Sequence, residues 1–406
     1  MARTAVKHAR QKSPINVWDA AVKAASTVTE VSSPYLPANM PHDAVPYIAL
    51  SAEAALVKPE LMRAVEKVLD SGRYILGPEC GEFEREFASY CGVGFAAGVA
   101  NGTDALHLVL RGLGLRPGDE VITVSNSFIA SAAAIALAGA KPVFVDIGDD
   151  GNMDPKKIEE AVSSRTRAIM PVHLTGRPAK MPEILAIAAR HGLFVLEDAA
   201  QAIGATLDGR RVGSWGDAAG FSLHPLKNLH AFGDAGIVTT NNREVQARLT
   251  QSRNHGLANR EQCDFWSFNS RLDEMQAAML RVQLRHLDAW TERRRALALR
   301  YNELLRPHVG VPDEGPGERC VFQTYVIRTK RRDELKQYLA QNGVETLIHY
   351  ATPIHLQPAA RDLGYVAADF PKTKRYVDEI LTLPLYHSLS HAQQDRVVEL
   401  ITSFYR

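Results

Sequence analysis

The 406-residue sequence has few cysteines. Its four, Cys80, Cys91, Cys263 and Cys320, are widely separated and form no CxxC pair. This distribution argues against a disulfide framework and against a zinc site. We therefore expect no metal, and we expect the cysteines to be reduced packing residues.

An excess of one charge and long apolar runs are also missing. Lys and Arg total 47 and Asp and Glu total 46, a formal net charge of +1, so nothing indicates binding to nucleic acid or to an anionic membrane. No apolar run approaches the roughly 20 residues that cross a bilayer, and the start lacks the apolar core of a signal peptide. We expect a cytoplasmic protein of small-molecule chemistry, without nucleic-acid or membrane partners.

The chain does contain alternating strand-like and helical patterns. From Tyr47 onward the apolar runs FAAGVA, EVITVS, KPVFVDI, RAIMPVHL and LFVLED are separated by Gly/Pro turns or amphipathic stretches. This alternation predicts βαβ units and an α/β fold, in which helices cover both faces of a mainly parallel sheet.

A later helical pattern divides the folded part. Leu280, Leu284 and Leu287 recur at helical spacing, and the pattern continues through TERRRALALRYNELL. We expect a large domain at 45–290 and a smaller C-terminal α+β domain at 291–406.

The first 44 residues are basic at the start and contain Ser and Pro at the end, which predicts a surface arm. The alternative is that INVWDAAVKAA forms an amphipathic helix that packs on the body or on a partner.

Two segments precede a lysine of interest, Lys227 in FSLHPLKNLHAFGDAG. LFVLEDAAQAIGA ends a predicted strand in Asp198, and an acid at the carboxyl end of a strand can face a ligand, although Asp also caps helices. ANGTDALHLVL opens a helix at Thr103 or Asp104. A helix start suits phosphate, although most such starts bind nothing.

Together these segments match the needs of pyridoxal phosphate (PLP). A lysine holds the aldehyde, a carboxylate keeps the pyridine nitrogen protonated, and N–H and hydroxyl donors bind the phosphate. Lys227 lies in the sequence among Leu226, Leu229 and Phe232, an unusual neighbourhood for a surface lysine. The pattern therefore favours a PLP enzyme.

At this point the chain resembles the StrS-type (DegT) nucleotide-sugar aminotransferases, which have the fold of aspartate aminotransferase (PLP fold type I). The match runs from about Tyr47 to the C-terminus through SGRYILGPECGEFEREFASYCG, NGTDALHLVL, EDAAQAIGA, FSLHPLKNL, RNHG, NSRLDEMQAA and IHYATPIHLQP. The resemblance implies a large PLP domain, a smaller C-terminal domain, and a homodimer with active sites at the interface.

The resemblance also assigns roles to individual residues. It implies that Lys227 forms the Schiff base, that Asp198 pairs with the pyridine nitrogen, and that Gln201 lies beside the cofactor hydroxyl. The remaining assignments are the phosphate turn at Gly102 and Thr103, the phosphate-binding Ser222, the ring-stacking Phe128, Asn269 reaching a neighbouring subunit's phosphate, and His349 and His355 bordering the substrate.

Some positions depart from the family's pattern. The segment before Phe128 reads VSNSF, where many relatives carry a proline after the valine. His230 and Ala235 replace residues that are commonly glycine, which removes backbone freedom and adds bulk toward the substrate side.

The activity implied is a ping-pong transamination. An amino group passes from L-glutamate to the cofactor and then to a keto-sugar, most simply one attached to a nucleotide, in amino-sugar biosynthesis. Alternatives are a PLP-dependent sugar dehydratase, an aminocyclitol aminotransferase, and a non-catalytic PLP-binding regulatory protein. Related dehydratases replace the lysine by histidine, so Lys227 argues for transamination; intact Lys227, Asp198 and Gln201 argue against the regulatory alternative.

Overall fold

The computed structural model describes residues 44–406 of the chain, so the expected arm at 1–44 and its alternative helix lie outside the described residues, apart from residue 44. The strands are β1 (Phe95–Val99), β2 (Glu120–Val124), β3 (Lys141–Val145), β4 (Thr166–Met170), β5 (Phe194–Asp198), β6 (Thr206–Leu207), β7 (Arg210–Arg211), β8 (Ala218–Ser222), β9 (Gly236–Thr240), β10 (Glu318–Arg319), β11 (Tyr325–Arg328) and β12 (Ile380–Leu383). The α-helices are α2 (Leu50–Ser71), α3 (Pro78–Cys91), α4 (Gly102–Gly112), α5 (Ile129–Leu137), α6 (Pro155–Ala161), α7 (Met181–His191), α8 (Arg243–Ser252), α9 (Glu274–Leu305), α10 (Arg332–Gln341), α11 (Pro371–Glu379) and α12 (His391–Tyr405).

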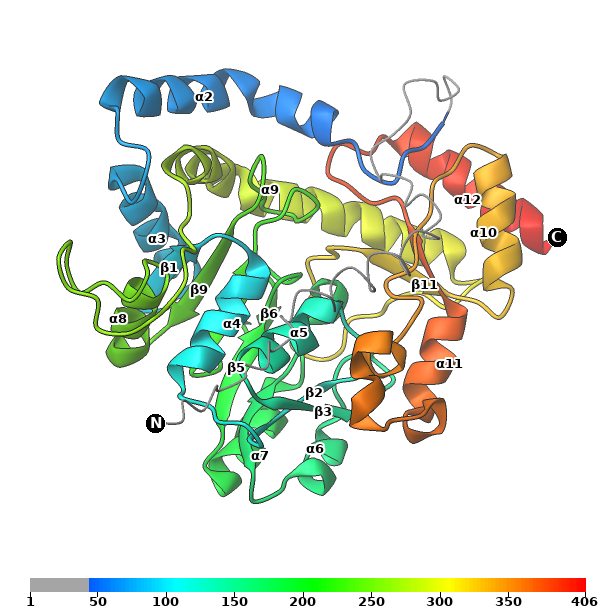
Figure 1. Cartoon of the computed structure of the whole chain (residues 1–406). Helices are drawn as coiled ribbons and strands as arrows, with labels where there is room; N and C mark the ends of the chain where they lie inside the picture. Colours follow the sequence, from blue (N-terminus) through cyan, green and yellow to red (C-terminus); the bar gives the residue numbers. More distant parts are fainter. Residues whose placement is uncertain (1–43) are drawn as a thin grey trace, which may run out of the picture. The chain divides into compact units, whose positions relative to one another are not determined.

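The main sheet has seven strands in the order β1-β9-β8-β5-β4-β2-β3 (Figure 1). Strand β9 is antiparallel to both of its neighbours, and the other pairs are parallel. The predicted runs from FAAGVA to LFVLED form β1 to β5, which confirms the mainly parallel α/β sheet. The sequence analysis did not predict strands β8 and β9. The loop between them contains no crossover helix, and β9 runs antiparallel to β8.

Alternation along each strand buries both faces of this sheet. Val121 packs with α4 and α5, whereas its neighbour Ile122 packs with α6 and α7. On β5, Leu196 packs on the side of α4 and α5, and Val195 packs on the side of α6 and α7. Because successive side chains of a strand point to opposite faces, apolar residues at both positions require helices on both sides, as the sequence predicted.

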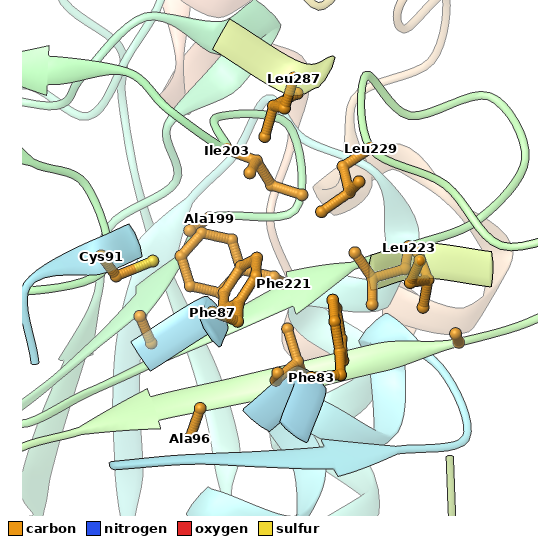
Figure 2. Close-up of a cluster of buried hydrophobic side chains, with 14 of the residues drawn as sticks. Phe83, Phe87, Cys91, Ala96, Ala199, Ile203, Phe221, Leu223, Leu229 and Leu287 are labelled. Carbon is orange, nitrogen blue, oxygen red and sulfur yellow. The ribbon is translucent and has the colours of Figure 1, made fainter. Parts of the chain in front are cut away.

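One core cluster packs α3 against the main sheet. Figure 2 shows Phe83 and Phe87 of α3 lying near Phe221 of β8 and Leu223. The rings of Phe87 and Phe221 meet edge to face, with centroids 5.1 Å apart. This packing anchors β8 immediately before the loop that carries Lys227.

The C-terminal part has its own core around the two-stranded β11–β12 sheet. Tyr301 from the end of α9 packs there with residues of α10 and α12, and Val45 belongs to the same cluster. Helix α9 passes through position 290 without interruption and lies along α2 (Figure 1). The domain boundaries drawn from the sequence stay a prediction.

Among residues 44–406, no helix has the length and apolar character that crossing a membrane requires.

Candidate active site

Most of the predicted site residues lie at one edge of the main sheet. Strands β5 and β8 are parallel neighbours and end at Asp198 and Ser222. Helix α4 begins at Gly102, shortly after β1, and α5 begins after Phe128. The carboxyl ends of parallel strands meet at the same edge, which is where α/β sheets bind ligands.

Asp198 is a buried carboxylate with two hydrogen-bond donors. The Ser131 hydroxyl, from the first turn of α5, donates to Asp198 Oδ2 at 2.7 Å, and the Ala200 N–H donates to Oδ1 at 3.2 Å. Burial raises the pKa of Asp198, while these hydrogen bonds and the charge of Lys227 oppose the rise. The carboxylate is therefore placed where a cationic partner would stabilise its ionised form.

Lys227 lies in the loop that follows β8. Its N–H donates to the carbonyl of His224 at 2.8 Å. Burial lowers the pKa of the amine from 10.5 to about 8, and the Asp198 carboxylate limits that decrease. A lowered pKa increases the neutral fraction of the amine near neutral pH, which is the nucleophilic form.

Gly102 and Ser222 form a donor-rich corner beside the start of α4. A Cβ added to Gly102 would lie 2.6 Å from the Ser222 Cβ, so only glycine lets the helix start approach this closely. Thr103 follows in the same first turn, where the Asn101 side chain accepts from the Asp104 N–H and the N–H groups of Gly102 and Thr103 have no intrahelical acceptor. Together with the Ser222 hydroxyl, these N–H groups suit an anion such as phosphate.

The side-chain amide of Gln201 is held from both sides. The Thr175 N–H donates to Gln201 Oε1 at 2.8 Å, and Gln201 Nε2 donates to the Tyr350 hydroxyl at 3.1 Å. The Tyr350 ring lies 5.6 Å from that of Phe128, centroid to centroid. Phe128 is 52% exposed, so much of its side chain remains accessible next to Tyr350.

His349 also belongs to this cluster. Burial and the positive charge of Lys227 lower its pKa to about 4, and its Nδ1 lies 3.0 Å from Thr382 Oγ1. A neutral imidazole therefore lies close to the lysine at neutral pH.

Two predicted residues lie apart from the cluster. His355 is buried against Phe370, with ring centroids 4.4 Å apart, and the acids that act on its charge are Asp146 and Asp369. Asn269 is exposed and pairs with Asn254. Among the described residues, neither the hydrogen bonds nor the charge interactions of His355 and Asn269 involve Lys227, Asp198 or Gln201.

The structure adds three residues that the sequence analysis did not identify. Ser131 binds Asp198, Tyr350 binds Gln201, and Gln323 binds both peptide groups that flank Lys227. Tyr350 directly follows His349, and that adjacency was the available signal for it. Nothing in the sequence pattern singled out Ser131 or Gln323.

The residues present fit PLP. The glycine at position 102, where a Cβ would fill the corner, leaves room for a phosphate against N–H donors and a hydroxyl. The buried Asp198 carboxylate suits a protonated pyridine nitrogen, the amine of Lys227 suits an aldehyde, and the exposed side chain of Phe128 suits an aromatic ring.

Comparisons with known proteins agree with this geometry. Residues 56–402 match the model of the DegT/DnrJ/EryC1/StrS aminotransferase family. The chain is 46% identical over 367 residues to a protein named pleiotropic regulatory protein of Geobacillus stearothermophilus, with 89% of this chain and 99% of the relative covered. It is 45% identical over 360 residues to the dTDP-3-amino-3,4,6-trideoxy-α-D-glucose transaminase of Streptomyces venezuelae, with 88% and 95% covered.

Solved structures show the same architecture. The crystal structure of S. venezuelae DesV superposes with a TM-score of 0.87 at 44% identity, covering 89% of this chain and 99% of that chain. NtdA of Bacillus subtilis, solved with bound PMP, has a TM-score of 0.84 at 30% identity, covering 94% and 91%. The predicted fold class is thereby confirmed.

Proposed function

The chain belongs to the DegT/DnrJ/EryC1/StrS aminotransferase family, and from this premise we propose the roles of its residues and the partners of its reaction. It is a PLP-dependent aminotransferase of nucleotide-linked sugars, as the sequence predicted. The observation that carries the proposed roles is the placement of a partly buried lysine, Lys227, in the loop after β8, next to the strand β5 that ends in the buried carboxylate Asp198. The pKa of Lys227 is lowered to about 8, and the Asp198 charge acts on it.

Each residue of the cluster has a distinct task in this proposal. Lys227 holds the cofactor covalently and, once displaced, carries a proton to and from the reacting carbon as general base and acid. Asp198 stabilises positive charge on the pyridine nitrogen. Gly102, Thr103 and Ser222 hold the phosphate. Bound there, PLP supplies an electron sink for the carbanion formed at the donor's α-carbon.

The remaining side chains position and shield the reacting groups. Gln201, fixed between Thr175 and Tyr350, orients the cofactor ring, and Phe128 covers one face of it. His349 borders the substrate as a neutral hydrogen-bonding group, since its pKa is lowered to about 4. His355 acts, in this proposal, only through the packing of the segment that follows His349.

We propose L-glutamate as the amino donor and a keto-sugar attached to a nucleoside diphosphate as the acceptor. The acceptor is supported by the names of the relatives, which include transaminases of dTDP-linked and UDP-linked amino sugars. The test is to incubate the purified protein with glutamate and a panel of nucleotide-linked 3-keto and 4-keto sugars. An amino sugar detected by mass spectrometry supports the proposal, and no product across the panel contradicts it.

We also propose a homodimer in which each site is completed by the partner. The support is Asn269, exposed on the same chain segment as Trp266, which is 90% exposed, and Phe268, which is 42% exposed. Such a surface suits burial against a second copy. Mixing inactive Lys227→Ala and Asn269→Asp proteins should restore activity through hybrid dimers. A catalytically active monomer in sedimentation rules this out.

Two relatives carry regulatory names, a pleiotropic regulatory protein and a sensory transduction protein, so a regulatory role besides catalysis is tested separately. The Lys227→Ala variant cannot capture the cofactor covalently. If cells carrying this variant have the same phenotype as cells in which the gene is deleted, the cellular role of the protein is catalytic. The cytoplasmic location expected from the sequence stays a prediction.

A further inference from the structure

Gln323 contacts the backbone on both sides of Lys227. Its Oε1 accepts a hydrogen bond from the Asn228 N–H at 2.8 Å, and its Nε2 donates to the Leu226 carbonyl at 2.6 Å. Gln323 is 7% exposed. One buried side-chain amide thus pairs with the residues immediately before and after the lysine, as a neighbouring strand would.

Gln323 is itself held in place by separate elements. Arg294 of α9 donates from Nη2 to the Gln323 carbonyl at 2.9 Å. A Cβ added to Gly176 would lie 2.8 Å from the Gln323 nitrogen, so the two backbones pack directly. Residue 175, next to that glycine, donates its N–H to Gln201. The segment around Gln323 therefore touches both the lysine loop and the turn that holds Gln201.

A second contact at the lysine differs in kind. His230 Nδ1 lies 3.1 Å from the Lys227 carbonyl oxygen, and the His230 carbonyl accepts from Gln283 Nε2 at 2.5 Å. The His230 ring thus turns back onto its own loop. The ring contact lies within the loop, whereas the Gln283 bond anchors the loop to α9 three residues beyond the lysine. Gln323 anchors the loop from outside at the two peptide groups of Lys227 itself.

We propose that Gln323 is a positioning residue that fixes the orientation in which Lys227 presents its amine, and so links the C-terminal segment at 321–324 to nitrogen transfer. The inference rests on the proposed role of Lys227. Pairing both flanking peptide groups leaves the lysine backbone little freedom, so its amine starts close to the reacting geometry.

The experiment compares Gln323→Leu with a matched control, Gln276→Leu. Gln276 also pairs through its amide with the backbone of this loop, accepting from the Phe232 N–H at 2.8 Å and donating to the Phe232 carbonyl at 3.1 Å. The Gln276→Leu substitution removes two amide–backbone hydrogen bonds, as Gln323→Leu does, but at Phe232, five residues beyond the lysine. A general loosening of the loop would affect both variants alike.

Two measurements separate positioning from pocket construction. The first is the rate at which cofactor-free protein captures PLP on Lys227, trapped by borohydride and mapped by mass spectrometry. The second is the non-covalent affinity for PLP with Lys227→Ala also present. We expect Gln323→Leu to slow capture at least tenfold with an affinity change under threefold, and Gln276→Leu to change both by less than threefold.

The outcomes are distinguishable. If the wild type captures no PLP on Lys227, the proposed role of the lysine fails. If the wild type captures PLP and Gln323→Leu captures it equally fast, or slows only as much as Gln276→Leu, the positioning role alone fails. A tenfold loss of non-covalent affinity would assign Gln323 to the pocket and would likewise overturn it.

A further variant and a measurement on the wild type guard against misfolding. Gln323→Met keeps the length of the side chain and removes both hydrogen bonds, and we expect the same slow capture. Hydrogen–deuterium exchange of the cofactor-free wild type should show slow exchange in peptides covering residues 225–232. Exchange there at the rate of an unstructured peptide contradicts the proposal.

Discussion

The hydroxyl of Ser131 lies 2.7 Å from Oδ2 of Asp198 and connects the first turn of α5 to the end of β5. Ser127 continues the row, with its Oγ 2.8 Å from that of Ser131. The Ser127 hydroxyl thus bonds to the Ser131 hydroxyl, which in turn donates to the carboxylate proposed to pair with the pyridine nitrogen. Since burial alone raises the pKa of Asp198, this row helps to keep the group ionised.

Ser131→Ala should move the acidic limb of the pH profile. Removing a hydrogen bond that favours the ionised form raises the pKa of Asp198 further, so the ionised carboxylate is lost at a higher pH. A hydrogen bond to a charged group contributes about 1.5–3 kcal/mol, equivalent to roughly one to two pKa units. The acidic limb of kcat/KM should shift upward by about one unit. Ser127→Ala should shift it by less than half as much, and an unmoved limb in Ser131→Ala contradicts the assignment.

Replacing Lys227 should change how stability depends on pH. The folded-state pKa of about 8 lies below the ordinary 10.5, so below pH 8 the cofactor-free protein carries the full penalty of a buried charged amine. Lys227→Met should then be more stable at pH 7 by up to about 3 kcal/mol. The difference should shrink as the pH rises from 8 to 10.5, where the unfolded wild-type chain holds more protons than the folded one. Urea unfolding over this range measures it, and a constant difference would refute the shift.

Gly102→Ala should weaken cofactor binding. The added Cβ meets Ser222 at 2.6 Å and must push the start of α4 away from the end of β8, so affinity for PLP should fall at least tenfold. Gly112→Ala is the matched control on the same helix, since its Cβ would lie 3.5 Å from Arg248 Cγ, an ordinary contact. It should keep wild-type affinity and gain up to about 1 kcal/mol of stability. Equal affinities in the two variants would exclude the close-approach explanation.

Glu53→Gln should destabilise the protein at neutral pH. Glu53 is buried, and its Oε1 lies 2.7 Å from His387 Nδ1. Burial raises the pKa of Glu53, but the hydrogen bond and charge of His387 outweigh it, and the net pKa is lowered. Stability from this pair is therefore present above the ordinary carboxyl pKa of 4.5 and is lost as the pH falls below it. We expect a loss of about 1–3 kcal/mol at pH 7 that begins to shrink only below pH 4.5 and disappears as the pH falls through the lowered folded-state pKa, measured by denaturant titrations. A loss independent of pH would point to packing instead.

The strands β1 to β5 and the class of the fold could be predicted because they rest on local patterns. Their apolar runs are long enough to bury two faces, and alternation with helical segments permits few topologies. Strand β8 was missed because AAGFS contains small residues with little strand preference. Strand β9, GIVTT, consists mainly of β-branched residues that favour strands, so its local signal was present and was overlooked. Lys227 and Asp198 could be proposed as site residues from the sequence because amine and carboxylate chemistry belongs to the residue type and its motif.

Tertiary structure alone decided which groups surround them. Ser131 is 67 positions from Asp198, and Gln201 and Tyr350 are 149 positions apart. No local periodicity encodes such pairs, because a hydrogen-bond partner depends on how distant elements pack. The same reason applies to Gln323, 95 positions from Asn228. The lowered pKa of Lys227 also arises only when folding removes water from around its amine.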